Sequence, residues 1–455
     1  MSSERTAQDQ ALREGSIFRL FLRYTIPTIA AMVVTGIYSA IDGMFIGHVL
    51  GEDGLAAIIL GYPIGAVLYA VGSMIGMGGA TLVSIYLGEE KIAKARKVIG
   101  VSFSLCLVFS VLLAVVGIGG GGWLLKWIGA EGKVLTMGVD YLFWYFAMGG
   151  FAVISMAFTS ILRNDGQVAM VTWILIIGGV MNVILDWLFI VVFPYELSGA
   201  AVATMLSQAI TAVLALSHFF WGKTRLRLSL KTLSLCWSTS KGILRLGFSS
   251  LLMTLYISLV LLFHSKAFLW VGQSIHLAAY SVVGYIEALF YFVFQGIALG
   301  IQPITSFNTG AGLHHRVKQV RNLAFAVTIF VSGLSIFVLY AFPEYAVRLF
   351  TGDNQALIPP TLHGMTLYFW GIPFEGLVLV GAAYFQSVNQ VKDANILTMG
   401  KILLFPVVLV GMASQYAVDG VWLALPISSA VLALWMLYAL NRQETTTLPQ
   451  APQQA

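Results

Sequence analysis

The stretch Pro27-Thr-Ile-Ala-Ala-Met-Val-Val-Thr-Gly-Ile-Tyr-Ser-Ala-Ile-Asp-Gly-Met-Phe-Ile-Gly47 decides the fold class, because it is long and apolar enough to cross a bilayer as a helix. Its one charged residue is Asp42. A carboxylate at membrane depth costs roughly 2.5–3.5 kcal/mol on insertion scales, so it is seldom kept without a role. The stretch therefore predicts a membrane helix that presents an acid to a proton, a metal ion or a cationic solute.

The rest of the chain has the composition of a polytopic membrane protein. Of its 455 residues, 58% are hydrophobic and 10% are charged, and the mean hydropathy is +0.87. A soluble protein of this length needs far more charged surface, and the net charge of +5 does not indicate a nucleic-acid partner. We predict an all-α protein with twelve transmembrane helices, at about 20–46, 54–86, 98–122, 138–162, 168–193, 199–221, 243–270, 277–308, 322–343, 361–386, 396–416 and 420–441.

Lysine and arginine set the expected orientation, since they gather on the cytoplasmic side of membrane proteins. Only Lys126, Lys133, Lys266 and Arg348 fall on the other side. The remaining 21 fall on one side: Arg5, Arg13, Arg19, Arg23, Lys91, Lys94, Arg96, Lys97, Arg163, Lys223, Arg225, Arg227, Lys231, Lys241, Arg245, Arg316, Lys318, Arg321, Lys392, Lys401 and Arg442. Both termini are therefore expected to be cytoplasmic.

Matches at an offset of 222 residues indicate an internal duplication. Leu22-Arg23 corresponds to Leu244-Arg245, Leu55-Ala56-Ala57 to Leu277-Ala278-Ala279, Gly78 to Gly300 and Gly88 to Gly310. Two repeats of six helices and the same topology are related by a pseudo-two-fold axis along the membrane normal, with a solute path between them. We predict an N-terminal lobe at 1–221, a cytoplasmic linker at 222–242, a C-terminal lobe at 243–441 and a disordered cytoplasmic tail at 442–455.

Three predicted helices of the first repeat place oxygen-bearing side chains in one layer. At 1.5 Å of rise per residue, Asp42 and Thr204 lie ~7 Å, and Asp186 ~10 Å, from the outer ends of their helices. Asn182 precedes Asp186 by four residues and shares its face, as Tyr38 does with Asp42. Several oxygens together suit a hard cation such as Na+, and they equally suit a protonated carboxyl. For Asn182 and Thr204 alone, hydrogen bonding between helices is the simpler explanation.

Three further residues have open interpretations. Pro27 either bends the first helix as a hinge for Asp42 or only kinks it for packing. Glu287 and Glu375 either draw a cationic drug into a cavity lined by aromatic residues or pair with Lys266 or His264. A nucleotide-binding loop, a zinc motif and a nucleophile elbow are missing from the sequence, so we expect neither an enzyme nor a cofactor.

The order of several motifs resembles the multidrug and toxic compound extrusion (MATE) transporters. The motifs are Ile37-Tyr-Ser-Ala-Ile-Asp42-Gly-Met-Phe-Ile-Gly47, Asn182-Val-Ile-Leu-Asp186, Gly199-Ala-Ala-Val-Ala-Thr204, Gln302-Pro303 and Asn308-Thr-Gly310-Ala-Gly312. The resemblance covers about 15–440. It implies cation-coupled efflux of small organic cations and drugs, by alternating access between two six-helix lobes, in the inner (plasma) membrane of a bacterium. We expect a monomer.

Within that family the chain is more similar to the branch of DNA-damage-inducible protein F than to the NorM-type branch. The resemblance implies that H+ or Na+ is held at Asp42, Asn182, Asp186 and Thr204, with Tyr38 and Tyr141 as hydrogen-bond partners. The NorM-type branch places an acid on the seventh helix, where this chain offers only His264. A flippase for lipid-linked anionic precursors is the alternative, although the acidic interior expected here does not suit a phosphate.

Overall fold

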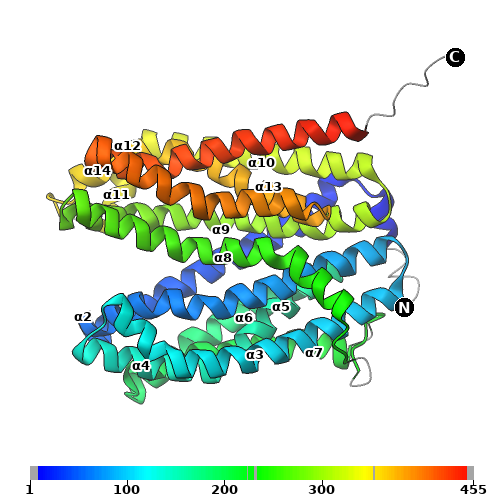
Figure 1. Ribbon diagram of the computed structural model, residues 1–455, viewed down its shortest axis with the longest axis horizontal. Coiled ribbons are helices and arrows are strands. Elements are labelled where there is room, and N and C mark those ends of the chain that lie inside the picture. Colours follow the sequence, from blue (N-terminus) through cyan, green and yellow to red (C-terminus); the bar gives the residue numbers. More distant parts are fainter. Residues whose placement is uncertain (1–8, 223, 230–232, 352–353, 448–455) are drawn as a thin grey trace.

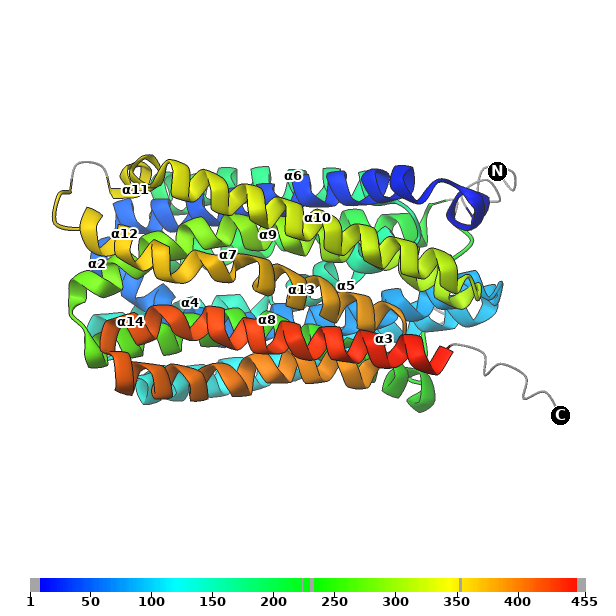
Figure 2. The same ribbon diagram turned by 90° about the horizontal axis from the view of Figure 1, so that it is seen from above.

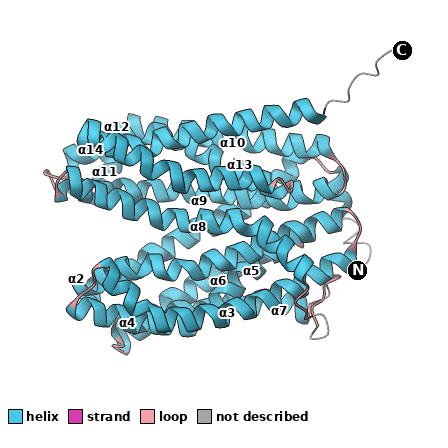
Figure 3. Cartoon of the chain, viewed as in Figure 1, coloured by secondary structure: helices cyan, strands magenta, loops and turns pink. Residues whose placement is uncertain are grey.

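The computed structural model describes residues 9–222, 224–229, 233–351 and 354–447, and its regular elements are helices (Figures 1 and 3). In chain order they are α2 (Ile17–Gly88), α3 (Ile92–Ile128), α4 (Gly132–Ala147), α5 (Gly150–Asn164), α6 (Val168–Asp186), the π-helix η1 (Trp187–Val192), α7 (Glu196–Phe220), α8 (Trp237–Val271), α9 (Ser274–Gly310), α10 (His314–Ala341), α11 (Pro343–Thr351), α12 (Ile358–Tyr368), the 3₁₀-helix η3 (Phe369–Gly371), α13 (Ile372–Ser387) and α14 (Val391–Thr447).

The described helices account for twelve membrane crossings. Ten segments are long and apolar enough to span, with the two halves of α2 counted separately, and the pair α4 and α5, bent by 51°, makes an eleventh span. The twelfth arises because α14 breaks at Ala417, where the backbone turns to φ 49° and ψ −126°. A similar break at Gly51, with φ 64°, divides α2 into two spans, and glycine enters that conformation without a steric penalty. The predicted all-α, twelve-helix fold is confirmed.

The helices form two bundles, α2 to α7 in one lobe and α8 to α14 in the other, which lie side by side in Figure 1 and overlap in the view from above (Figure 2). The start of α2 and the end of α14 lie at the same end of the molecule, which we call the terminal end. Many exposed side chains on the outer helices are large and apolar, including Val111 and Val115 of α3 and Phe330 and Phe337 of α10. Such a surface suits hydrocarbon, where lipid replaces water around the protein.

The lobes meet through backbone contacts that follow the sequence repeat. A Cβ added at Gly88 would lie 2.1 Å from the carbonyl oxygen of Phe307, and one added at Gly310 would lie 2.0 Å from that of Ile85. The offset of 222 relates Gly88 to Gly310 and Ile85 to Phe307, so the two contacts are images of each other. Only glycine lets two helices approach this closely. The predicted pseudo-two-fold relation is therefore visible in the packing of α2 against α9.

Three expectations from the sequence need correction. Lys401 does not belong with the cytoplasmic lysines, because its side chain is 1% exposed inside the C-terminal lobe. The predicted disordered tail from 442 is helical as far as Thr447, and residues 448–455 lie outside the described part of the chain. The predicted linker is also shorter than expected, since α8 begins at Trp237. The apolarity of the chain located the helices well, but it did not reveal which charged residues find a buried partner.

Candidate functional site

Asp42 and Asp186 of the N-terminal lobe stand on neighbouring helices, α2 and α6, which pack against each other. Asp186 is the last residue of α6, and the π-helix η1 follows it directly. A π-helical turn is rare and often marks a functional site, because it re-aims the side chains at its ends. The two helices that were predicted to place their acids in one layer are thus neighbours in the structure.

Four acceptor atoms in this layer are buried without a hydrogen-bond donor. They are Oδ1 of Asp42, Oδ1 of Asn182 and both carboxyl oxygens of Asp186. Asp186 is 0% exposed and Asn182 is 1% exposed, whereas Asp42 is half-buried. A buried acceptor without a donor costs about 1–3 kcal/mol, and more if it is charged. Such a group of oxygens is stabilised by a proton or by a cation that they share.

The remaining predicted members of this layer line its edges. The side-chain amide of Asn182 faces the hydroxyl of Thr204 in α7, with Nδ2 and Oγ1 3.5 Å apart, the upper limit for a hydrogen bond. The ring of Tyr38 lies on Gly179 of α6, where an added Cβ would be 2.7 Å from the ring. The ring of Tyr141 in α4 lies against Gly61 of α2, where an added Cβ would be 3.6 Å from the ring. The structure therefore places the six predicted residues on four helices that pack against one another, α2, α4, α6 and α7.

Pro27 lies inside α2, which continues through it and is helical up to Gly51. Proline has no amide hydrogen, so the carbonyl group of Arg23 lacks its usual helical donor. The hydroxyl of Thr172 in α6 donates to the carbonyl oxygen of Pro27 at 3.0 Å. The weakened turn of α2 is thus joined directly to the helix that carries Asp186.

The chemistry of the layer fits a light, hard cation or a proton. Within the described residues, no three His, Cys, Asp or Glu side chains converge as a transition metal requires. Two carboxylates, an amide oxygen and a hydroxyl are the oxygen donors that Na+ accepts, and a proton on either carboxyl would convert that acid into a donor for its neighbours. The side chains that would hold either ion are those of Asp42, Asn182, Asp186 and Thr204.

The two predicted acids of the C-terminal lobe have partners that the sequence did not suggest. The ammonium group of Lys401 in α14 makes a short ion pair with Oε1 of Glu375, and the hydroxyl of Ser429 donates to Oε2 at 2.7 Å. The hydroxyl of Tyr368 donates to Oε2 of Glu287 at 2.6 Å. The partners predicted for these acids, Lys266 and His264, were wrong.

Glu287 and Glu375 do line one pocket, together with aromatic residues of α9 and α12 such as Phe290 and Tyr368. The space open to the centres of water molecules in it is ≈ 20 Å³. One water needs roughly 10–15 Å³ by this measure, so the pocket holds about one water and not a drug. A second pocket of ≈ 60 Å³ lies between the lobes and is lined by both polar and apolar residues, with Ser73 of α2 and Gln386 of α13 among the polar ones.

Lys401 and Gln302 are buried polar residues whose roles the sequence did not reveal. Gln302 of α9 is 0% exposed and donates to the hydroxyl of Thr81 in α2 at 2.9 Å, and it accepts from the amide of Asn164 in α5 at 3.1 Å. It therefore ties the two lobes together near the terminal end. The motif Gln302-Pro303 was a signal, but without the fold nothing indicated that its glutamine reaches into the other repeat.

Comparisons with known proteins agree on one family. The family model MatE matches residues 27–188 and 246–412. The multidrug export protein MepA of Staphylococcus haemolyticus is 23% identical over 437 residues, which cover 95% of this chain and 96% of that protein. The multidrug export protein MepA of Staphylococcus aureus strain COL is 22% identical, and the match covers 92% of this chain and 93% of that protein.

Two solved structures have the same fold along nearly the whole chain. One is described as the outward-facing conformation of a multidrug resistance MATE family transporter of the MOP superfamily. Its TM-score is 0.88 and its sequence identity is 22%, and the match covers 97% of this chain and 99% of that chain. The other is a MOP superfamily transporter from Pyrococcus furiosus Vc1, described as having a binding pocket of reverse polarity, with a TM-score of 0.89, 22% identity and the same coverage.

Proposed function

The chain belongs to the multidrug and toxic compound extrusion family of membrane transporters, which are not enzymes, and we propose that it is a cation-coupled efflux antiporter for organic cations and drugs. The observation that supports this proposal best is the set of four buried acceptor atoms on Asp42, Asn182 and Asp186. A membrane protein keeps such costly groups where an ion must bind and leave. The names of the relatives add support for a multidrug substrate range.

The coupling ion acts on the N-terminal lobe in this proposal. A proton or Na+ entering the layer neutralises one of the two negative charges and so relieves the repulsion between the two carboxylates, which is strong at low dielectric. The half-buried Asp42 is the entry point, since Asp186 is completely covered. Neutralisation changes the packing of α2 on α6, and the turn at Pro27 is where α2 bends most easily because a helical hydrogen bond is missing there. The branch of DNA-damage-inducible protein F, which carries its acids in this lobe, remains the one we favour.

The substrate is expected to carry positive charge and flat apolar surface. Glu287 supplies the negative charge of this pocket, because the charge of Glu375 is balanced by Lys401. Aromatic rings beside it, such as those of Phe290 and Tyr291, add stacking and cation–π contacts. The pocket around Glu287 would have to widen as the lobes move before a drug can occupy it.

The setting of the transporter follows the sequence prediction. We propose a monomer in the inner membrane of a bacterium, with an N-terminal lobe that ends near residue 221, a C-terminal lobe that begins with α8, and the terminal end facing the cytoplasm. The excess of Lys and Arg at that end supports this orientation. A flippase for lipid-linked anionic precursors would need an available cation in its interior. Lys401 does not serve, because Glu375 neutralises it.

Transport of ethidium in proteoliposomes, with H+ and Na+ gradients imposed separately, tests the proposal. Asp42→Asn and Asp186→Asn should each reduce gradient-driven transport to near background, and the double variant should be little worse, because the two acids serve one ion. Asp140→Asn is the matched control, as Asp140 is exposed on α4. The proposal is abandoned if Asp42→Asn, expressed at parental level, transports at the parental rate under both gradients.

A further inference from the structure

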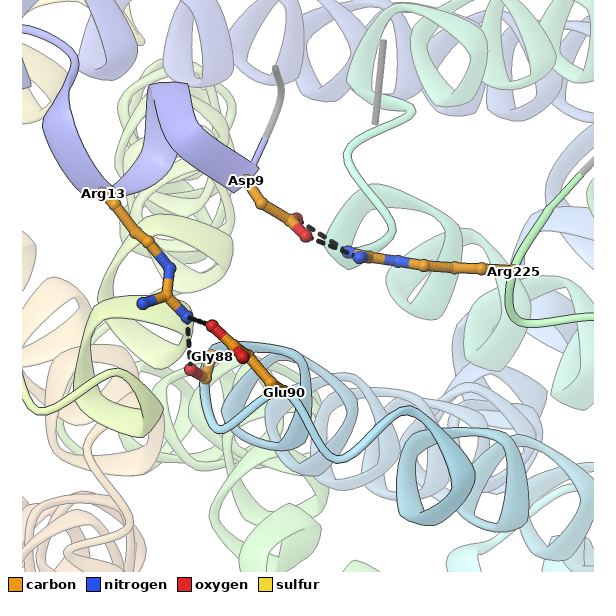
Figure 4. Close-up of polar contacts among 5 residues, drawn as sticks. All are labelled: Asp9, Arg13, Gly88, Glu90 and Arg225. Atoms are coloured by element: carbon orange, nitrogen blue, oxygen red, sulfur yellow. Dashed lines mark hydrogen bonds and ion pairs between the residues drawn. The ribbon is translucent and has the colours of Figure 1, made fainter. Parts of the chain in front are cut away.

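Residues 9–15 directly precede α2 at the terminal end and are helical over 9–14; Figure 4 shows the polar contacts of Asp9 and Arg13 in this segment. It is attached first to the N-terminal lobe and its linker. Asp9 receives two hydrogen bonds from the guanidinium group of Arg225, at 2.5 and 2.7 Å. Arg13 donates to the carbonyl oxygen of Gly88 at 2.9 Å and to the carboxylate of Glu90 at 2.9 Å. One side of the segment is therefore fixed to the end of α2 and to the connection between the lobes.

The C-terminal lobe holds the same segment from its other side. Arg316 of α10 donates to the carbonyl oxygens of Leu12 at 3.0 Å and of Gly15 at 2.7 Å. The side-chain amide of Asn308 in α9 also donates to the carbonyl oxygen of Leu12, at 3.2 Å. The side chain of Leu12 is 5% exposed. The segment thus joins the two lobes through charged and amide donors as well as through apolar packing.

One of the close backbone contacts between the lobes lies beside this segment. Arg13 bonds to Gly88, the residue that packs against the backbone of Phe307, and the guanidinium group of Arg13 is 5.7 Å from the centre of the Phe307 ring. Separating the lobes at this end must therefore pull Gly88 away from Phe307. The segment cannot keep its bonds to both lobes during that separation, because one set is anchored on α2 and the other on α9 and α10.

We propose that residues 9–15 form a latch that holds the terminal end closed and must release one lobe before that end can open. The inference rests on the proposed alternating access, and it adds a control point to it. Its bonds are charge-assisted but partly exposed, with 23% exposure for the side chain of Arg225 and 25% for that of Asp9. Such contacts are strong enough to bias an equilibrium between two states and weak enough to break in each transport cycle.

The latch works together with deeper contacts. The backbone contact of Gly88 with Phe307 and the hydrogen bonds of Gln302 to Thr81 and Asn164 remain when the latch is removed. Loss of the latch therefore shifts the balance toward an open terminal end without separating the lobes permanently. In the intact protein, opening of this end should increase with ionic strength, because salt screens the exposed ion pairs of the latch.

Accessibility of a buried position at this end measures the shift directly. Ile85 is 9% exposed and its carbonyl oxygen contacts Gly310, so Ile85→Cys reports opening. The reporter is placed in a Cys236→Ser background, in which the remaining Cys106 is 0% exposed. Inside-out vesicles are treated with a membrane-impermeant maleimide. Arg316→Gln should raise the alkylation rate about tenfold, as loss of one or two hydrogen bonds to a charged donor implies.

Matched variants separate the latch from a general loss of structure. Arg19→Gln removes the same charge from an exposed site on α2 and should stay within about twofold of the parent. Asp9→Arg should raise the rate like Arg316→Gln, and the exchange Asp9→Arg with Arg225→Asp should restore it. Equal alkylation rates in the parent, Arg316→Gln and Asp9→Arg would overturn the latch. Because alkylation needs no coupling ion and no drug, that result would leave the proposed efflux function standing.

Discussion

The ion pair between Lys401 and Glu375 offers a quantitative test of how the C-terminal lobe balances its charge. Lys401 is 1% exposed, its ammonium group lies 4.5 Å from the centre of the Tyr256 ring, and Ser429 holds the second oxygen of Glu375. The perturbation is Lys401→Met, which keeps the length of the side chain and removes the charge. Its companion is Glu375→Leu, and the two are combined in a double variant.

The expected magnitudes follow from these contacts. Breaking a buried pair by removing one partner costs about 3–5 kcal/mol, because an uncompensated charge remains. Lys401→Met should fall at the lower end, about 3 kcal/mol, since Ser429 still donates to Glu375. For a unit of roughly 200 residues, 1 kcal/mol corresponds to about 2–4 °C in Tm, so the loss is about 6–12 °C. The double variant should lie within about 1 kcal/mol of the parent, because both charges leave together.

Thermal unfolding in one detergent, followed by intrinsic fluorescence, measures all four proteins. The expected pattern is two large single losses and a small double loss, which is a coupling energy of about 3 kcal/mol or more. Losses that simply add in the double variant would show that the two charges do not interact, and the account of a neutralised Glu375 would fail. Dye transport by the double variant then tells whether the lobe needs this pair for function at all.

Three further predictions follow from other parts of the chain. Gly247→Ala should reduce the yield of folded transporter, because its Cβ would lie 1.7 Å from the carbonyl oxygen of Met74. Gly119→Ala is the control and should leave the yield unchanged, because no atom lies within 4 Å of the added Cβ. Thermal unfolding of the two variants compares their stability. Hydrogen bonds, first from the Ser238 hydroxyl and then from the backbone amide of Thr239, lower the pKa of Cys236 to about 6. The rate of Cys236 alkylation should therefore rise with pH through that value and then level off. Only a reagent on the cytoplasmic side should reach this thiol. Glu287→Gln should weaken transport of cationic dyes more than that of zwitterionic drugs in a proteoliposome assay, and equal losses would assign Glu287 to packing.

The sequence by itself determined the class, the number of crossings and the position of the main acids. Apolar segments long enough to span, with breaks at glycine and charged residues, are a local property, so the twelve crossings could be counted without a structure. The offset of 222 residues likewise indicated two related lobes. Asp42 and Asp186 stood out because a carboxylate in an apolar run is costly wherever its helix is placed.

The tertiary structure decided which polar groups meet. Lys401 looks like one more cytoplasmic lysine in the sequence, but α14 places it against Glu375, and the pair is charge-neutral. Gln302 is hydrogen-bonded to Asn164 of the other lobe, and Arg316 is hydrogen-bonded to Leu12, 304 positions away in the sequence. Such pairings depend on how helices rotate and pack against each other, which the period and polarity of one helix do not fix. The physical reason is that burial selects helix positions locally, whereas partner choice is settled only when the helices are assembled.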